Sequence, residues 1–305
     1  MHQKAVGIMQ HYKGVANLFT ENLNTQNIYE ESFTRNIGVI SIEEQKKLKN
    51  ARVTVVGAGG VGGITLIQLA RMGIGNLHVI DQDVFEASNI NRQMLSSISK
   101  LGKSKALVAL ETLKDINPLL QVKITQEFVT EDNAKDLLAN TDIIIDATDN
   151  LVARVIIHRT AQTLGIPSIW IAVTPPFRGG VMSLTPESVP YEIALGYPSY
   201  QQELTPEMQN RIHSLKDGRA LYSIKHGADE QWANSYVKKD RPWAVLSPVA
   251  NIVGVLASFE AFKFIVNRED LQPITSPNII QINLSNPNMV LVCEPENGSW
   301  NYTTL

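Results

Sequence analysis

A run of glycines between a strand pattern and a helix pattern constrains this chain more than any other feature. Residues 52–56 read Arg-Val-Thr-Val-Val and lead directly into Gly-Ala-Gly-Gly-Val-Gly-Gly at residues 57–63. Apolar side chains at helical spacing follow at residues 64–72. Glycine lets the backbone approach a phosphate closely, and the N-terminus of the following helix presents free N–H groups to negative charge. The pattern therefore predicts a nucleotide-binding turn, with a tight turn that binds nothing as the structural alternative.

Strand and helix patterns continue to alternate after this turn. We expect strands at residues 77–81, 122–128, 142–147 and 168–173, with helices at 104–116 and 151–164 between them. Such alternation is typical of a parallel sheet with helices on both faces. The sequence thus predicts an α/β fold: a doubly wound, Rossmann-like, mostly parallel sheet.

The regions on either side of this core have different patterns. Residues 1–50 are polar and helical in character, and Ser41 and Glu44 have the spacing of a capping box. Residues 175–245 are rich in proline and are predicted to be an irregular region, apart from a helix that begins at Thr205-Pro206 and ends at Gly218. Residues 246–305 then supply a long apolar helix and two strands, at 279–284 and 289–292. The expected divisions are therefore 1–50, 51–174, 175–245 and 246–305.

Composition excludes several classes of protein. The formal net charge of -3 argues against a general nucleic-acid binder, which usually carries a basic excess. Cys293 is the only cysteine, so neither an internal disulfide nor a zinc site built on paired cysteines is possible. The apolar stretch 245–266 includes Asn251, Glu260 and Lys263, which favours a buried or interface helix over a membrane span. We expect a cytoplasmic, soluble enzyme.

Polar residues beyond the glycine turn suggest which nucleotide is bound. Asp81 ends the second strand, where a carboxylate can accept hydrogen bonds from ribose hydroxyls. The glycine turn and Asp81 alone fit an NAD(P)-dependent oxidoreductase equally well. Asn89, Arg92 and Gln93 lie in the loop that follows, and an arginine with amide donors there suits a triphosphate better than a dinucleotide. Each of these side chains taken singly is also compatible with a solvated surface.

Two further residues extend this prediction. Lys105 lies in the first turn of a helix, where the macrodipole disfavours a cation by roughly 0.3–1 kcal/mol and a bound anion would offset the cost. Asp149 follows a buried parallel strand, at the sheet edge where open α/β sheets bind ligands. Asp149 is therefore a candidate ligand for Mg²⁺ against phosphate oxygens. The structural alternative is that Asp146 or Asp149 caps the helix that follows.

Residues 35–173 resemble the ThiF/MoeB adenylyltransferase family, which shares its ATP-binding domain with ubiquitin-activating enzymes. The matching pieces occur in order: Phe-Thr-Arg-Asn at 33–36, the glycine turn at 57–62, Asp-Gln-Asp at 81–83, Ser-Asn-Ile-Asn-Arg-Gln at 88–93, Gly-Lys-Ser-Lys at 102–105 and Thr-Asp-Asn at 148–150. Residues 247–292 are similar more loosely. The resemblance implies that ATP and Mg²⁺ are the cofactors. It also implies that residues 51–174 form the ATP-binding domain and that a carboxylate attacks the α-phosphate, releasing pyrophosphate.

The resemblance also implies a role for each site residue. Residues 1–50 would form an arm at the dimer interface, from which Arg35 reaches into the ATP site of the partner in a homodimer. Gly57, Gly59 and Gly60 would cradle the phosphates, Asp81 would bind ribose, and Asp83 would also contribute to binding the nucleotide. The triphosphate would be held by Asn89, Arg92, Gln93 and Lys105. Asp149 would be the magnesium ligand.

This chain also departs from the family pattern. Many members hold a structural zinc on paired Cys-x-x-Cys motifs, and many pass the acyl group to sulfur. A chain whose single cysteine falls in a predicted terminal strand fits neither the zinc site nor the sulfur transfer. We therefore expect no zinc, and a nitrogen or oxygen nucleophile that consumes the acyl-adenylate. A peptide in natural-product (antibiotic) biosynthesis, as in enzymes of the microcin C and pantocin type, is the leading substrate.

Other readings of the substrate and the activity stay open. A tRNA substrate, as for the threonylcarbamoyladenosine dehydratase, is the first alternative; an NAD(P)-dependent oxidoreductase and a non-catalytic scaffold subunit are the others. Region 175–245 would choose the substrate. Its basic side chains suit an acidic peptide or a phosphate backbone, and equally a solvated surface; they are Arg178, His213, Arg219, Lys225, His226, Lys238, Lys239 and Arg241.

Overall fold

A single sheet runs through the computed structural model, which describes residues 25–305. The strands are β1 (Arg52–Val56), β2 (Asn76–Ile80), β3 (Gln121–Thr125), β4 (Ile143–Asp146), β5 (Ser168–Thr174), β6 (Arg178–Leu184), β7 (Ile279–Asn283) and β8 (Val290–Cys293). Their order is β3-β2-β1-β4-β5-β6-β7-β8, with β1 to β5 parallel and the last three strands antiparallel. The predicted doubly wound, mostly parallel sheet is confirmed.

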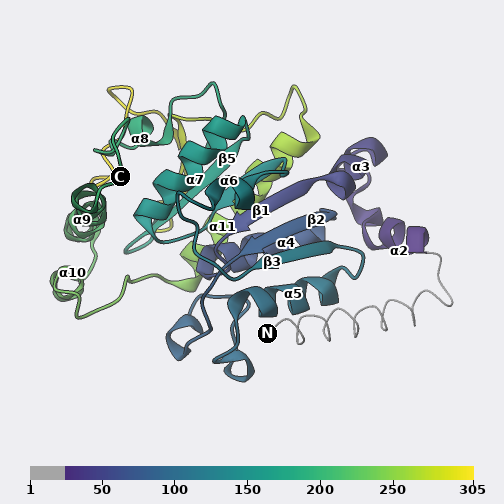
Figure 1. Cartoon of the computed structure of the whole chain (residues 1–305), viewed down its shortest axis with the longest axis horizontal. Helices are drawn as coiled ribbons and strands as arrows, with labels where there is room; N and C mark the ends of the chain where they lie inside the picture. Colours follow the sequence, from purple (N-terminus) through teal and green to yellow (C-terminus); the bar gives the residue numbers. More distant parts are fainter. Residues whose placement is uncertain (1–24) are drawn as a thin grey trace.

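Helices cover both faces of this sheet (Figure 1). The alternation of side chains along β1 explains why, since Val55 packs into one apolar cluster and Val56 into the other. The first cluster joins the sheet to α3 (Ile42–Asn50), α4 (Gly60–Met72), α5 (Lys105–Ile116) and α11 (Ser247–Val266). The second joins it to α6 (Ala134–Leu138), α7 (Leu151–Leu164), α8 (Tyr191–Ala194) and α9 (Pro206–Ser223).

The described part of the N-terminal segment lies at the amino ends of the strands. It consists of α2 (Thr25–Ser32), the short 3-10 turn η1 (Thr34–Asn36) and α3, which leads into β1. The capping box is present, because the Ser41 side chain accepts from the N–H of Glu44 and the Glu44 carboxylate accepts from the N–H of Ser41. Residues 1–24 of the predicted helical arm lie outside the described residues.

Residues 175–245 contain more regular structure than the sequence suggested. Besides β6, α8 and α9 they include η4 (Ile224–His226) and α10 (Glu230–Val237). Thr205 caps α9 as predicted, but the helix continues through Gly218 to Ser223, so the predicted end at Gly218 is wrong. A Cβ on Gly218 would lie 2.6 Å from Cγ2 of Thr303, and the glycine therefore admits the C-terminal tail rather than ending the helix.

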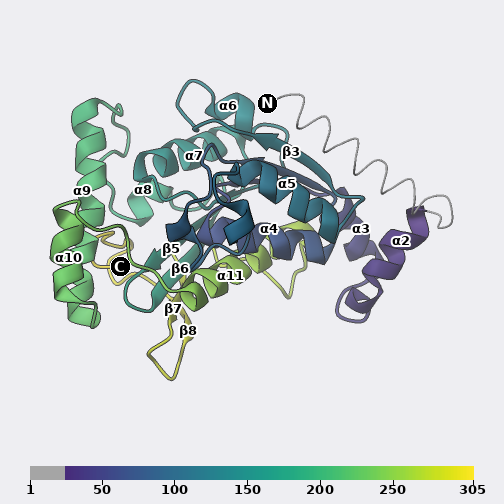
Figure 2. The same cartoon turned by 90° about the horizontal axis from the view of Figure 1, so that it is seen from below.

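The apolar helix α11 is a core element of this fold. By length and composition alone it could span a membrane, but just over half of its most apolar stretch is buried inside the protein. It lies on the same face of the sheet as α4 (Figure 2). The buried Glu260 accepts hydrogen bonds from the Ser183 hydroxyl and the N–H of Ile274 and pairs with Lys263 at 2.5 Å. Two of the polar side chains that argued against a membrane span, Glu260 and Lys263, thus form an ion pair in the protein interior.

Candidate active site

A cleft of about 790 Å³ opens at the carboxyl ends of the parallel strands. It is bounded by the ends of β1, β2, β4 and β5, by α9 and by the residues that lead into α11. Its lining includes every residue predicted to bind nucleotide or metal from within the same chain: Gly57, Gly59, Gly60, Asp81, Asp83, Asn89, Arg92, Gln93, Lys105 and Asp149. Segments far apart in the sequence therefore converge on one ligand-sized space.

The glycine turn owes its shape to close backbone contacts. Gly57 has a φ of +100°, in the left-handed region, and a Cβ there would lie 2.7 Å from the carbonyl oxygen of Ala147. A Cβ on Gly62 would lie 1.9 Å from the carbonyl oxygen of Gly57. Side chains at either position would push the turn away from the sheet, so these glycines fix where α4 begins and where its free N–H groups point.

Asp81 anchors this turn and keeps acceptor capacity for a ligand. Its two carboxylate oxygens accept hydrogen bonds from the backbone N–H of Ala58 at 2.7 Å and of Asp83 at 2.8 Å. Burial raises the pKa of Asp81, and these two hydrogen bonds together with Lys105 oppose that shift. Because each carboxylate oxygen has two lone pairs, the carboxylate can still accept from hydroxyl groups in the cleft.

The loop after β2 places a cation and an amide over the glycines. The Arg92 side chain packs against Gly60, whose Cβ would lie 3.3 Å from Cγ of Arg92. Its Nη1 donates to the carbonyl of Ser88, and no carboxylate lies within ion-pair distance of it in residues 25–305. Burial lowers the pKa of Arg92, and the field of Asp149 opposes this. A half-buried cation without an ion pair is suited to receiving an anionic ligand.

Two buried amides complete this loop. Asn89 ends the short turn η2 (Ala87–Asn89), and its side-chain oxygen accepts from the N–H of Glu86, which holds the loop in shape. Gln93 is also buried, and its Oε1 has no hydrogen-bond partner in the described part of the chain. Buried polar atoms usually have a partner, so the unmatched oxygen marks Gln93 as a site for a ligand or an ordered water.

Lys105 is held by a carboxylate from the neighbouring loop. It is the first residue of α5, it is 7% exposed, and its Nζ lies 2.9 Å from Oδ2 of Asp83. Burial would raise the pKa of Asp83, but the hydrogen bond and charge of Lys105 lower it overall. Asp83 therefore orients the lysine at the cleft, and it does so by direct contact with Lys105.

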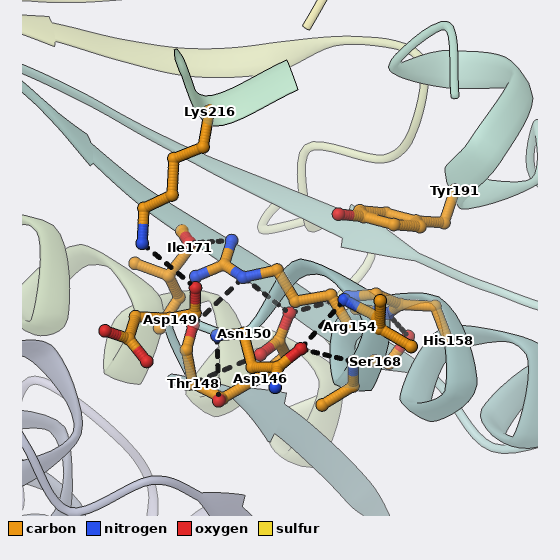
Figure 3. Close-up of polar contacts among 12 residues, drawn as sticks. Asp146, Thr148, Asp149, Asn150, Arg154, His158, Ser168, Ile171, Tyr191 and Lys216 are labelled. Carbon is orange, nitrogen blue, oxygen red and sulfur yellow. Dashed lines mark hydrogen bonds and ion pairs between the residues drawn. The ribbon is translucent and has the colours of Figure 1, made fainter. Parts of the chain in front are cut away.

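The loop after β4 separates a structural aspartate from an exposed one (Figure 3). Asp146 is fully buried and contacts His158 Nε2 at 3.1 Å and Arg154 Nε at 3.6 Å. Asn150 caps α7 by accepting from the N–H groups of Val152 and Ala153. The alternative that an aspartate caps this helix is therefore wrong. Asp149 is exposed, and in residues 25–305 its carboxylate has no hydrogen bond or ion pair.

Several residues of the cleft were not predicted from the sequence, and four of them matter for its chemistry. Arg154 lies on α7, and its guanidinium donates to the carbonyls of Thr148 and Ile171. Lys216, on α9, donates to the carbonyl of Asp149 at 3.1 Å. The other two are Trp243 and Tyr302. They come from separate regions without a shared motif, so no spacing in the sequence would have grouped them.

Arg35 does not line the cleft. It lies in the exposed turn η1, at the amino ends of the strands and therefore at the opposite edge of the sheet. Ile37, Val39 and Ile42 beside it are 43%, 79% and 61% exposed. Apolar side chains exposed close together in the sequence are available for contact with a partner. Arg35 can therefore serve an active site only if that site belongs to another copy of the chain.

The described residues offer no protein-only metal cage. No group of three or more histidine, cysteine, aspartate or glutamate side chains gathers anywhere in residues 25–305. Magnesium needs few protein ligands, because one or two carboxylates plus phosphates and water complete its octahedron, and the unengaged Asp149 fits that requirement. Cys293 lies in β8, away from the cleft lining, and burial raises its pKa.

Comparisons with known proteins place this geometry in a family. The ThiF family model matches residues 33–299. The probable adenylyltransferase/sulfurtransferase MoeZ of Mycobacterium tuberculosis is 36% identical over 183 residues, which cover 60% of this chain and 45% of MoeZ. The adenylyltransferase and sulfurtransferase uba4 of Aspergillus niger is 31% identical over 77% of this chain and 43% of its own length. This chain spans about half the length of these curated relatives.

Solved structures share the fold at lower sequence identity. E. coli MccB with AMPCPP and MccA superposes with a TM-score of 0.65 and 21% identity, covering 88% of this chain and 72% of that one. PaaA superposes with a TM-score of 0.62 and 22% identity, covering 91% of this chain and 80% of that one. Similarity at this level supports a common fold.

Proposed function

Because the chain belongs to the ThiF family, we propose that it is an ATP-dependent adenylyltransferase that converts a substrate carboxylate into an acyl-adenylate. The convergence of the glycine turn, Asp81, Arg92, Lys105 and Asp149 on one cleft carries this proposal. Its curated relatives are named adenylyltransferases, and one solved structure of the same fold is of MccB with ATP. Positively charged and amide donors in that position match a triphosphate.

The chemistry requires few covalent steps from the protein. A carboxylate oxygen bonds to the α-phosphorus while the bond from that phosphorus to the bridging oxygen of pyrophosphate breaks, and pyrophosphate leaves. The N–H groups at the start of α4, with Arg92 and Lys105, neutralise charge on the phosphates. Asp81 accepts from the ribose and fixes the nucleoside, so the α-phosphorus is presented to the carboxylate.

Asp149 would hold Mg²⁺ at this site. The ion, when bound, neutralises phosphate charge and stabilises the leaving pyrophosphate. Asp149 supplies one carboxylate oxygen from the loop after β4, and Lys216 donates to the carbonyl of the same residue and so steadies that loop. The exposed Asp149 and the nearby cation Arg92 would then both face the triphosphate.

We also propose that the active form is a homodimer. The position of Arg35 at the opposite sheet edge supports this, since it can enter an ATP site only from a partner. The exposed apolar side chains of Ile37, Val39 and Ile42 would be covered in such a dimer. We further propose that this homodimer acts in the cytoplasm.

For the substrate, we propose a peptide whose acyl-adenylate is consumed by a nitrogen or oxygen nucleophile during natural-product (antibiotic) maturation. The fold shared with MccB, solved with the peptide MccA, supports a peptide. Cys293 lies outside the cleft lining, which disfavours transfer to sulfur. A tRNA-modifying dehydratase is the alternative, and salt-sensitive tRNA binding to the purified protein would favour it over a peptide.

Titrations with an ATP analogue and with nicotinamide dinucleotides separate adenylation from the other activities. We expect α,β-methylene-ATP with Mg²⁺ to bind saturably to the purified protein and NADH and NADPH not to bind. Binding of a nicotinamide dinucleotide in preference to the ATP analogue would overturn the adenylation proposal and favour an oxidoreductase. A scaffold subunit would bind neither, and the full set of cations in the cleft disfavours that reading.

A further inference from the structure

A second group of cations begins in the cleft with Lys216 and extends beyond its lining. It comprises Arg178 at the start of β6 and Lys216 and Arg219 on α9. None of the three pairs with a carboxylate within 4 Å in residues 25–305. Lys216 and Arg219 are three residues apart and so lie on the same face of the helix.

The two arginines are buried more deeply than unpaired cations normally are. Arg219 is 3% exposed, and among the described residues its Nε has no hydrogen-bond partner, nor do Nε and Nη2 of Arg178. Burial lowers the pKa of Arg178 to about 10, and the charge of Arg219 contributes to the shift. Two like charges that act on each other without a carboxylate disfavour the folded state, and an anion near them would reduce that cost.

Tyr302 connects these cations to the cleft. The Arg219 guanidinium lies 4.4 Å from the centroid of the Tyr302 ring, and Tyr302 itself lines the cleft. The N–H of Tyr302 donates to the carbonyl of Leu195, and Gly218 gives the space that Thr303 occupies. The C-terminal tail thus packs beside α9 (Figure 1) and brings the Tyr302 ring against Arg219.

The charges around Tyr302 point to an excess of positive charge. Burial alone would raise the pKa of Tyr302, but Arg219, Arg154 and Lys216 outweigh burial and lower it. Arg154 is already paired with Asp146, whereas Arg219 and Lys216 have no carboxylate partner within residues 25–305. The position next to the Tyr302 hydroxyl is therefore favourable for an anion.

We propose that Lys216 and Tyr302 bind the carboxylate of the acyl substrate, and that Arg219, which lies over the Tyr302 ring, supplies further positive charge to this anion subsite, with Arg178 adding to the charge around Arg219. The inference rests on the proposed adenylation and names its carboxylate site. Lys216 Nζ lies 3.1 Å from the carbonyl oxygen of Asp149, the proposed magnesium ligand. A carboxylate at Lys216 would therefore lie next to the phosphates that it must attack.

The test is a titration that needs no turnover. The protein is labelled with 3-fluorotyrosine, and the ¹⁹F resonance of Tyr302 is assigned by its loss in Tyr302→Phe. Acetate is the probe, with acetamide as the neutral control and ionic strength fixed with sodium chloride. We expect acetate to shift this resonance saturably and acetamide to leave it unchanged, both in free protein and with saturating α,β-methylene-ATP and Mg²⁺.

Charge-removing variants assign the subsite. Lys216→Met and Arg219→Gln should each weaken acetate binding about tenfold, since a hydrogen bond to a charged group is lost or its field is reduced. Arg211→Gln makes the same charge change at an exposed position on the same helix and should bind acetate like the wild type. Arg178→Met covers the case in which Arg219→Gln does not fold. This variant should melt no lower than the wild type, because the charge that acts on Arg219 is removed, yet it should bind acetate less tightly.

Three results would overturn the subsite: no saturable shift with acetate, an equal shift with acetamide, or unchanged acetate affinity in Lys216→Met. Displacement of acetate by the ATP analogue would also overturn it, because the cations would then belong to the phosphate site. Failure of the proposed function has a different signature. In that case the ATP analogue would not bind, while acetate would still shift Tyr302 and support the anion subsite.

Discussion

Lys105 Nζ lies 2.9 Å from Asp83 Oδ2 at the start of α5, so a cation at a helix N-terminus is compensated by a carboxylate from the preceding loop. The macrodipole disfavours a lysine there by roughly 0.3–1 kcal/mol, and Asp83 offsets that cost without a ligand. Because Asp83 is half-exposed and Lys105 is buried, the pair fixes the ammonium at the cleft. A phosphate that binds the Lys105 ammonium would therefore contact a group that already pairs with Asp83.

This pair makes an asymmetric prediction. Lys105→Met should lower ATP–pyrophosphate exchange by about a hundredfold or more, as expected when a preorganised cation is removed from developing charge. Asp83→Asn should lower it by less than about tenfold, since the amide still contacts the lysine. Lys103→Met, at a nearby exposed position, is the matched control and should keep wild-type exchange. Equal losses in the first two variants would contradict a purely orienting role for Asp83.

Substitutions at two glycines of the turn distinguish an effect on folding from an effect on ligand binding. Gly62→Ala places a Cβ 1.9 Å from the carbonyl oxygen of Gly57, so we expect a clearly lower Tm and no nucleotide binding. At Gly59 the nearest atom to a Cβ, in the Gln93 amide, is 3.7 Å away. Gly59→Ala should therefore melt close to the wild type but bind α,β-methylene-ATP more weakly, because the methyl group faces the ligand. Thermal melts and calorimetric titrations of both variants check this, and wild-type binding by Gly59→Ala would remove it from the cradle.

His78 predicts how stability depends on pH. Burial, with Lys123 contributing, lowers the pKa of His78 from 6.5 to about 4. The unfolded chain then binds this proton more readily than the folded one, so stability falls as pH drops from about 6.5 to about 4 and this contribution is flat outside that window. Melts at pH 7.5 and 4.5 measure the difference, which His78→Gln should reduce. The exposed His213→Gln should leave it unchanged. An unaltered difference in His78→Gln would contradict the assignment.

The homodimer proposal is tested by mixing two inactive variants. A subunit with Arg35→Ala cannot supply Arg35 to the active site of its partner. A subunit with Asp149→Ala lacks the proposed magnesium ligand in its own active site. After exchange of subunits, half of the dimers are mixed and one of their two sites is intact, so exchange should recover to about a quarter of the wild-type rate. No recovery in dimers shown by mass to be mixed would exclude Arg35 acting across the interface.

Much of the fold was predictable because local patterns and tertiary packing agree. The glycine turn, the alternating strands and helices and the Ser41–Glu44 box are all local signals, and all three are confirmed. The third strand ends at Thr125, three residues before the end of the predicted range, because β2 offers partners only to that point. The prediction that α9 ends at Gly218 was wrong because this glycine makes room for Thr303, a residue distant in the sequence.

The site was predictable where a strand end fixes the position of a residue. Asp81 follows β2 and Asp149 follows β4, so parallel topology brings both to one edge of the sheet. Lys216 and Tyr302 reach that edge from α9 and the C-terminal tail, whose positions depend on side-chain packing that no local pattern encodes. The burial of Arg219 and the unpartnered donors of Arg178 within residues 25–305 were equally hidden, since basic residues in a proline-rich stretch resemble an ordinary surface.

ATP–pyrophosphate exchange in Arg92→Ala and Asp149→Ala, driven by a carboxylate that supports exchange in the wild type, tests the central claim most directly. Arg211→Ala, an exposed change on α9, is the control. We predict that both site variants fold, with Tm values near that of the wild type, and lose exchange, while the control keeps it. Exchange at the wild-type rate in both site variants would contradict the assignment of this cleft to adenylation.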